Sequence, residues 1–498
     1  MSLRDPAENG RATHPFFVTD SMFDSWNFWL SLSGYLLTLL LVPWVLLHKS
    51  RNPVSTAAWI MAIILLPLFG GLMFVVFGIN RVERHRSEKL RVSGRLGKHL
   101  PALSQYQIIP GEAHDPKQDR LMYLADRVAD TLATTGNDVE ILPDTNRTLG
   151  LIEQAILAAE ETVHLEYYIW RPDRTGKRIR DLLIRKAKEG VKIRFLYDGI
   201  GSMHLNNRFL SLMRAAGIHV AAFLPGATFR ERWSINLRNH RKIVIVDGRV
   251  GFTGGMNIGD EYLGRNPHLG YWRDTHLRLV GPTVLQLQQV FAEDWCYATG
   301  EELTESHLFP APDSPGSVCA QVVPGAPTGG VSPLHSLMFA AINDARESVT
   351  LATSYFVPPT SLMAALETAA LRGVRVRLLV AGRSAYFWTV LAGRSFYDSL
   401  LRSGVEIHEY ERGLMHAKTL TVDGTWSLIG TANFDARSLM LNFEVAVALY
   451  DAKIAEQLEA QFEQDIQHAE LIDPETWGLR SGWRILGENV FRMFAPVL

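Results

Sequence analysis

Residues 240–247 read HRKIVIVD, and residues 416–423 read HAKTLTVD. Both segments place a histidine, a lysine and an aspartate at the same spacing. At equal distances downstream, each is followed by a glycine and an asparagine, which are Gly254, Asn257, Gly430 and Asn433. One chance match at five fixed positions has a probability on the order of 10⁻⁴ from average residue usage. Two matches at equal spacing therefore indicate a duplicated unit.

The sequence around each segment repeats one order of secondary structure. In the first copy we predict strands over 161–168, 189–196 and 218–223, with a helix that ends at Gly217. In the second copy we predict a strand from Glu347, strands over 372–379 and 405–410, a helix over 361–371 and another ending at Gly404. The predicted fold class is therefore α/β, with two tandem sandwich repeats related by pseudo-twofold symmetry.

Each segment is expected to run from a polar loop into a strand, Ile243 to Val246 and Thr419 to Val422. Alternation along an extended chain puts the histidine and the lysine on one face. A turn at Asp247-Gly248 and at Asp423-Gly424 then brings the glycine and the asparagine back beside them. A single histidine is usually an ordinary core or surface residue, but packing does not demand the same polar set twice.

Two histidines, two lysines and two asparagines brought together by such symmetry suit a phosphodiester substrate. The lysines and amides can hold the non-bridging oxygens and stabilise the charge that builds up at phosphorus. One imidazole can attack phosphorus, while the other protonates the leaving alkoxide and later deprotonates the acceptor.

Each imidazole also needs an orienting carboxylate. The strands after the two motifs offer Asp274 and Glu444 at like positions, and we favour these over Asp247 and Asp423, which stand at turns. Without H-E-x-x-H, an EF-hand loop or an obvious acidic cluster, the sequence predicts no metal and no cofactor. The predicted catalytic residues are His240, Lys242, Asp247, His416, Lys418 and Asp423, with Asn257, Asn433, Asp274 and Glu444 binding phosphate or supporting them.

The N-terminal part contains two long stretches without charge, Ser25 to Leu47 and Asn52 to Asn80. Each is long enough to cross a hydrocarbon core of about 30 Å as a helix. We predict two antiparallel spans, about 26–47 and 56–78. A cleaved signal peptide fits poorly because the first stretch begins late and a second follows. Two buried helices of a soluble domain are the remaining alternative.

Charge next to the spans predicts their orientation. The segment Arg81 to Lys98 holds seven Lys/Arg, whereas the turn between the spans holds two. The positive-inside rule then places both the N-terminus and the large C-terminal part in the cytoplasm. The predicted parts are a cytoplasmic tail 1–24, a transmembrane hairpin 25–80, a basic linker and helix 81–136, repeat one 137–309, a linker with the first strand of repeat two 310–333, repeat two 334–470 and a C-terminal segment 471–498.

Composition narrows the functions further. Fifty basic and 52 acidic side chains give a net charge of −2, which argues against a protein that mainly binds nucleic acid. The only cysteines, Cys296 and Cys319, form no C-x-x-C, so a disulfide scaffold and a cysteine zinc site are excluded.

Taken together, these residues resemble the phospholipase D superfamily, whose signature is the duplicated H-x-K-x₄-D. Within it, the chain resembles bacterial cardiolipin synthases of the type with a two-helix N-terminal anchor. Segments that carry the resemblance include Glu166-Tyr-Tyr-Ile169, Asn239-His-Arg-Lys242, Tyr271-Trp-Arg-Asp274, Gly430-Thr-Ala-Asn433, Asp435-Ala-Arg437-Ser438 and Leu441-Asn-Phe-Glu444. Ser354 departs from the family, which usually has proline before the Tyr-Phe pair, and this bears on acceptor preference.

The resemblance implies a transphosphatidylation at a bacterial inner membrane, with the catalytic part in the cytoplasm. One phosphatidylglycerol would give its phosphatidyl group to a histidine and release glycerol, and a second would accept it to form cardiolipin. The usual order in the superfamily makes His240 the nucleophile and His416 the acid/base. The resemblance leaves open whether other membrane phospholipids serve as acceptors and whether the protein forms an oligomer.

Three alternatives remain: a membrane-anchored hydrolase that releases phosphatidic acid, a nuclease, and a non-catalytic membrane scaffold. Water can intercept the same phosphohistidine, so the hydrolase depends on how well the site excludes water. Two further stretches could touch lipid, Phe229 to Arg241 and the C-terminal segment from Trp477. The first stretch could instead be a solvated basic loop, and the second could instead pack on the catalytic body.

Overall fold

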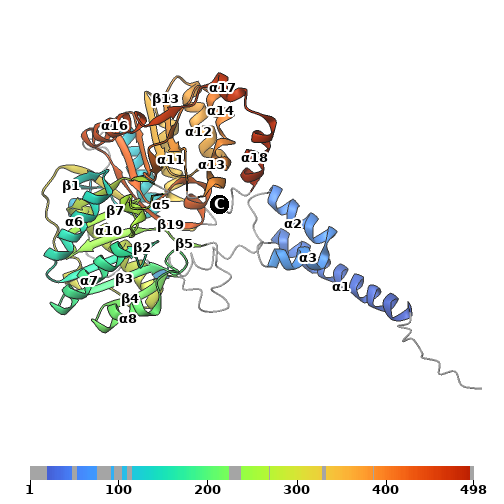
Figure 1. The fold of residues 1–498 in the computed structure, drawn as a ribbon, viewed down its shortest axis with the longest axis horizontal. Coiled ribbons are helices and arrows are strands. Elements are labelled where there is room, and N and C mark those ends of the chain that lie inside the picture. The colour runs from blue at the N-terminus through green and yellow to red at the C-terminus, as the bar shows by residue number, and fades with distance from the viewer. Residues whose placement is uncertain are drawn as a thin grey trace, which may run out of the picture. The chain divides into compact units, whose positions relative to one another are not determined.

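The computed structural model describes residues 20–47, 53–75, 91–92, 94, 104–108, 115–223, 237–267, 270–327, 332–384 and 386–493 (Figure 1). The chain forms two units, Met1–Asn80 and Arg81–Leu498. Most of the predicted tail, of the basic segment 81–98 and of the loop Phe229–Arg241 lies outside the described residues.

Within its described residues, the first unit has the helices α1 (Asp20–Leu47), α2 (Pro53–Leu65) and α3 (Pro67–Met73). The prediction of one continuous helix over 56–78 is wrong, because the chain leaves the helical conformation at Leu66, where φ is −135°. Leu66 precedes a proline, whose ring disfavours helical geometry in the residue before it.

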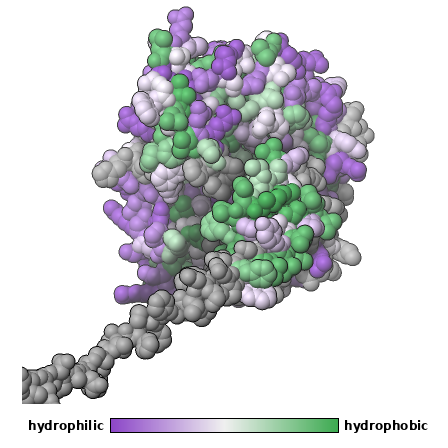
Figure 2. Space-filling view, turned by 90° about the vertical axis from the view of Figure 1, so that its right-hand side faces the viewer, coloured by the Kyte–Doolittle hydropathy of each residue, from purple (hydrophilic) through white to green (hydrophobic). Residues whose placement is uncertain are grey.

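Few side chains of this unit are buried; those that pack together are Leu41, Val45, Ile63 and Phe74. Many other apolar side chains are exposed, such as Leu39, Leu40, Leu47 and Leu65. Figure 2 shows a broad hydrophobic area on the face that it draws. Among the helices of the described residues, none is long and apolar enough to cross a membrane.

In the described part of the second unit, one mixed sheet of 16 strands extends across both halves. Its strands from the first half are β1 (Thr134–Leu142), β2 (Thr162–Tyr167), β3 (Lys192–Asp198), β4 (His219–Phe223), β5 (Arg238–Asn239), β6 (Lys242–Val246), β7 (Val250–Gly254) and β9 (His276–Val280). Those from the second half are β10 (Val318–Gly325), β11 (Ser348–Thr353), β13 (Arg375–Ala381), β14 (Glu406–Tyr410), β16 (Thr419–Val422), β17 (Trp426–Gly430), β19 (Asn442–Leu449) and β20 (Ala469–Leu471).

The strand order shows the duplication directly. Inward from β20 it reads β14-β13-β11-β16-β17-β19-β10, and it continues as β1-β9-β7-β6-β2-β3-β4. From β10 to β14, each strand of the second half thus has its counterpart at the mirrored position in the first, while β20 adds an edge strand without one; β1 and β10 pair antiparallel at the join. The α/β class and the two repeats were expected, and the structure adds that the two tandem repeats form one continuous mixed sheet.

Helices cover both faces of this sheet (Figure 1). The helices of the described part of this unit are α5 (Pro116–Ala129), α6 (Thr145–Ala158), α7 (Arg174–Lys188), α8 (Asn207–Ala215), α10 (Pro282–Thr299), α11 (Pro333–Asp344), α12 (Thr360–Leu371), α13 (Phe387–Arg394), α14 (Tyr397–Arg402), α15 (Ala436–Met440), α16 (Ala452–Ile466), α17 (Pro474–Gly478) and α18 (Gly482–Met493). Helices α17 and α18 pack on α14 and α13, respectively. Strand β6 illustrates the two faces, because Val244 and Val246 pack with α6 to α8 while Ile243 and Ile245 pack with α10.

Candidate active site

The two histidine–lysine segments lead into inner strands of the sheet. Strand β6 begins at Lys242, and β16 begins directly after Lys418. Both strands end in the predicted Asp-Gly turn, in which φ is 52° and 64° at Asp247-Gly248 and 52° and 58° at Asp423-Gly424. Two successive positive φ values are typical of a tight hairpin whose twist matches that of its strands.

The two aspartates of these turns hold backbone rather than substrate. Asp247 accepts backbone N–H bonds from residues 160, 161 and 162 at 2.7–2.9 Å. Asp423 accepts the equivalent bonds from the backbone N–H groups of residues 346, 347 and 348. It also forms an ion pair with Lys117 of α5 at 2.6 Å. Neither lines the cavity described below. Their inclusion among the catalytic residues is therefore corrected to a structural role.

Two parallel strand pairs bring the two halves together at the histidines. β5 pairs in parallel with β19, and β15 (Gly413–Met415) pairs in parallel with β8 (Tyr271–Arg273). The backbone N–H of His240 donates to the Phe443 carbonyl at 2.9 Å, and that of His416 donates to the Arg273 carbonyl at 2.7 Å. Each histidine loop is thus fixed on a strand of the opposite half.

The predicted carboxylates follow the same exchange. His240 Nδ1 lies 2.9 Å from both carboxylate oxygens of Glu444, and His416 Nδ1 lies 2.7 Å from Asp274 Oδ2. Because an ionised carboxylate only accepts hydrogen bonds, each Nδ1 carries the proton and each Nε2 is left to react. Sequence reasoning selected both carboxylates but did not foresee that each serves the histidine of the other repeat.

Each carboxylate is supported differently. Glu444 accepts bonds from Thr431 Oγ1 at 2.6 Å and from Asn442 Nδ2 at 3.1 Å. Asp274 accepts the Thr275 N–H at 2.8 Å and lies against Gly255, where a Cβ atom would come within 2.0 Å of Oδ1. Burial alone would raise the pKa of both carboxyl groups, but the neighbouring histidine and lysine outweigh it and lower the pKa.

The histidines themselves are buried and neutral. Burial lowers the pKa of His240 to about 4 and that of His416 to about 4, although the paired carboxylates oppose this shift. At neutral pH both imidazoles are therefore unprotonated at Nε2.

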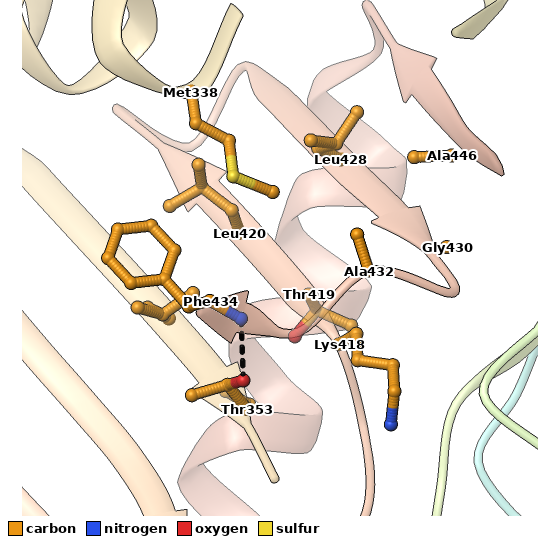
Figure 3. Close-up of a pocket in the computed structure, with 12 residues that line it drawn as sticks. Met338, Thr353, Lys418, Thr419, Leu420, Leu428, Gly430, Ala432, Phe434 and Ala446 are labelled. Carbon is orange, nitrogen blue, oxygen red and sulfur yellow. Dashed lines mark hydrogen bonds between the residues drawn. The ribbon is translucent and has the colours of Figure 1, made fainter. Parts of the chain in front are cut away.

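The lysines stand close behind the same loops. Lys242 Nζ donates to the His240 carbonyl at 2.6 Å, and Lys418 Nζ donates to the His416 carbonyl and, at 2.9 Å, to Ser354 Oγ. Burial lowers the pKa of Lys242 to about 7 and that of Lys418 to about 8. Figure 3 shows the Lys418 side chain pointing away from the apolar residues Leu420 and Leu428 of β16 and β17. In the same view Thr353 Oγ1 accepts the Phe434 N–H at 3.0 Å.

A cavity of about 570 Å³ opens in front of the two histidines. His240, His416, Asn257 and Asn433 all line it, and Asn257 is fixed because its Oδ1 accepts the Ile169 N–H at 3.1 Å. No group of three or more potential metal ligands occurs in the part of the chain that the structure describes. The double-histidine centre has the room and the polar groups for a tetrahedral phosphorus.

The walls of this cavity differ beside the two histidines. Tyr168 contacts the His240 ring edge-on at a centroid distance of 4.8 Å, and Arg238, Arg437 and Asn442 lie on this side. The His416 ring faces Trp272 at 5.0 Å, with Tyr262 and Leu414 nearby. From the sequence, Tyr168, Trp272, Arg437 and Asn442 were noted only within segments of the family resemblance, and Arg238 only within the basic stretch 229–241. They were not assigned to the site, although aligning the two repeats at their motifs places Arg238 opposite Leu414.

Comparisons with known proteins agree with this architecture. The family described as "Cardiolipin synthase, PLD-like domain" matches residues 152–295 and 338–466, and "Phospholipase_D-nuclease N-terminal" matches residues 36–78. The cardiolipin synthase of Geobacillus kaustophilus (strain HTA426) is 38% identical over 93% of this chain and 92% of its own length. Cardiolipin synthase 1 of Bacillus cereus is 35% identical over 93% and 92%.

Among solved structures, the phosphatidylserine synthase of Haemophilus influenzae Rd KW20 shares the fold. It matches with a TM-score of 0.58 and 14% sequence identity, over 77% of this chain and all of its own. At this level of identity the similarity concerns the fold alone.

Proposed function

Because the chain belongs to the cardiolipin synthases of the phospholipase D superfamily, we propose that it transfers a phosphatidyl group from one phosphatidylglycerol to another, giving cardiolipin and glycerol. The observation that carries this proposal is the pair of reciprocal imidazole–carboxylate contacts, His240–Glu444 and His416–Asp274, around one cavity.

In the first step, Nε2 of one histidine attacks the phosphorus of the donor lipid. A nitrogen–phosphorus bond forms, the bond from phosphorus to the headgroup glycerol breaks, and the other imidazole delivers a proton to the leaving oxygen. In the second step, that imidazole removes the proton from a hydroxyl of the acceptor headgroup. The new oxygen–phosphorus bond forms as the nitrogen–phosphorus bond breaks, so no nucleotide takes part.

The buried charges fit this sequence of events. A neutral imidazole is ready to attack, and the carboxylate at its Nδ1 stabilises the positive charge that develops on the ring. The anionic phosphodiester favours protonation of the second imidazole, which burial alone disfavours. Lys242, Lys418, Asn257 and Asn433 stabilise the additional charge at phosphorus.

We further propose that the protein works at the bacterial inner membrane, with its catalytic part on the cytoplasmic side. The exposed apolar side chains of α1 to α3 support an anchor in the lipid. Helix α18 exposes Trp483, Leu486 and Met493, and it packs on α13 through the Phe387–Phe491 contact. Tyr386 immediately precedes α13, and Trp388 lies in its first turn; both line the cavity. A lipid-facing surface at α18 would therefore adjoin the site.

The test is to incubate the detergent-solubilised chain with phosphatidylglycerol alone, without nucleotide or divalent metal, and to identify the products by mass spectrometry. We expect cardiolipin with an equal amount of free glycerol. Phosphatidic acid without cardiolipin would keep the double-histidine chemistry but make the protein a hydrolase.

A further inference from the structure

Two buried arginines lie behind the imidazole–carboxylate pairs. The guanidinium of Arg241 donates from Nε to the main-chain carbonyl of Glu444 at 2.8 Å. The guanidinium of Arg273 donates from Nη1 to the main-chain carbonyl of Asp274. Both arginine side chains are almost completely buried, and neither is among the described residues that line the cavity. The carboxylate residue of each histidine is thus held at its backbone by a group that lies outside the cavity.

Each guanidinium also forms an ion pair with an aspartate of a helix. Arg241 Nη1 pairs with Asp294 of α10, and Arg241 Nη2 donates to the Gly325 carbonyl at 2.8 Å. Arg273 Nε lies 2.8 and 2.9 Å from the two carboxylate oxygens of Asp465 of α16. In both cases the aspartate belongs to one half of the sheet and the carboxylate residue that is held belongs to the other. Each arginine therefore joins the two halves behind one histidine.

The two arginines come from different positions of the repeat. Alignment of the histidine segments places Arg241 opposite Ala417, and alignment of the carboxylate strands places Arg273 opposite Phe443. The guanidinium carbon of Arg241 lies 5.8 Å from the centre of the Phe443 ring. A packing arrangement that was simply duplicated would keep its arginine at one position. The same contact formed from two positions favours a role at the carboxylates themselves.

We propose that Arg241 and Arg273 are positioning residues, each of which keeps the carboxylate residue that it holds against its histidine. A held carbonyl fixes the peptide plane at that residue and, with it, the direction of the side chain toward Nδ1. A guanidinium suits this task because its rigid fork donates to a carbonyl and to a carboxylate at once. Arg241 acts on His240 alone, and Arg273 acts on His416 alone. The inference rests on the proposed function, because it assigns each arginine to one partner of the double-histidine reaction.

The variants remove each ion pair as a whole, because an aspartate left buried without its arginine destabilises the fold. They are Arg241→Met/Asp294→Asn and Arg273→Met/Asp465→Asn. The matched control is Arg377→Met/Glu463→Gln, which removes a buried arginine of β13 and its carboxylate partner on α16. Circular dichroism and thermal unfolding of the full chain in detergent would establish the folded fraction of each variant, to which all rates are referred.

Two reactions distinguish the histidines. Release of p-nitrophenolate from a phosphatidyl ester of p-nitrophenol needs the attacking imidazole but no acid, whereas transfer to phosphatidylglycerol needs both imidazoles. Each arginine variant should follow the alanine variant of its own histidine. The variant whose histidine attacks should therefore slow the p-nitrophenolate burst, and the other should keep the burst and slow the transfer.

We expect kcat of the affected reaction to fall by about tenfold to 10²-fold, the cost of displacing a catalytic group by about 1 Å. KM should stay within about threefold, because neither arginine lines the cavity. When Glu444→Gln is already present, the Arg241 variant should cost no more than about threefold further, and the same holds for the Arg273 variant with Asp274→Asn. The control should leave both reactions within about twofold.

Equal slowing of both reactions by both arginine variants would overturn the proposal, as would lower thermal stability with unchanged rates. A full further loss on top of the carboxylate variants would also overturn it, because the arginines would then act by another route. Absence of cardiolipin with the unaltered chain would refute the proposed function instead. The p-nitrophenolate burst would still show whether the two arginine variants differ as their histidines do.

Discussion

The two sides of the active-site cavity share their chemistry and differ in their surroundings. Each side has a histidine whose Nδ1 is bonded to a carboxylate of the opposite half. Beside His240 the wall carries Arg238, Arg437 and Asn442, which we call the polar flank. Beside His416 the equivalent positions hold Leu414, Glu261 and Trp272, which we call the aromatic flank.

This difference separates what catalysis requires from what recognition requires. A phosphorus atom between two imidazoles needs a base, an acid and fixed positive charge on both sides, and the repeats supply these equally. The substrate is not symmetric, since one end of the donor is a glycerol headgroup and the other carries two acyl chains. A polar and an aromatic flank fit these two ends.

The largest effect is expected on removing either imidazole. His240→Ala and His416→Ala should each lower cardiolipin formation by at least about 10⁴-fold, because groups that act as one unit lose nearly all catalysis together. Phosphatidylglycerol turnover measured by mass spectrometry checks this, with the exposed His219→Ala as the control. Substantial turnover in one of the two site variants would break the equivalence of the two sides.

Next come the orienting carboxylates. Glu444→Gln and Asp274→Asn should each cost about 10² to 10⁴-fold, because an amide no longer stabilises the imidazolium or fixes its tautomer. As a control, Asp247→Ala should lower the free energy of unfolding by about 1–3 kcal/mol, since three backbone N–H groups lose their acceptor, with turnover of the folded protein retained. A carboxylate variant that behaved like the turn variant would show that its pairing is structural.

The flanks also bear on the order of the two histidines. In-line displacement places the leaving glycerol opposite the attacking imidazole, and the polar flank beside His240 suits that glycerol. We therefore expect His416 to carry the phosphatidyl group, the reverse of the usual order in the superfamily.

A substrate with a p-nitrophenyl leaving group tests this order, because its departure needs no acid. His240→Ala should then accumulate the adduct on His416, found by digestion and mass spectrometry. An adduct on His240 in the His416→Ala variant would instead make His240 the nucleophile. It would contradict the placement of the leaving glycerol at the polar flank.

A smaller effect is expected from pH. Burial lowers the pKa of Lys242 to about 7 and that of Lys418 to about 8, so both lose their charge as the pH rises through this range. Loss of each charge removes attraction for phosphate. Because each lysine contributes up to about tenfold per pH unit above its pKa, kcat/KM for phosphatidylglycerol should fall by up to about 100-fold per unit above pH 8 if both charges are needed. A profile that stays flat to pH 10 would mean that the lysines remain charged in the free enzyme.

The smallest effect is expected from replacing Ser354, which contacts Lys418 at a position where the two repeats carry different residues. Tyr168 of the first repeat aligns with Ser354 of the second, and Ser354 Oγ accepts a bond from Lys418. Ser354→Ala should lower kcat/KM by up to about tenfold, within the range for a lost hydrogen bond to a charged group. Steady-state rates with phosphatidylglycerol measure this, and a loss above about 100-fold would give Ser354 a larger role than one bond.

The sequence foretold the local parts of this site better than their assembly. The Asp-Gly turns and the strands after His240 and His416 follow from short-range pattern, and the structure shows them as expected. The exchange of carboxylates could not be read from spacing, because His240 and Glu444 are 204 residues apart and meet only through the docking of the two halves. The break at Leu66 could have been predicted from Pro67, which follows it. We predicted one continuous helix instead because this stretch contains no charged residue.

The central claim is that two histidines act in succession on one phosphorus. It can be tested through the stereochemistry of phosphatidylglycerol in which one non-bridging oxygen is replaced by sulfur in a single configuration. Two displacements, first by histidine and then by the acceptor hydroxyl, predict that the transferred phosphorus retains its configuration in the cardiolipin formed. Inversion would show direct displacement by the acceptor in one step and would contradict the account.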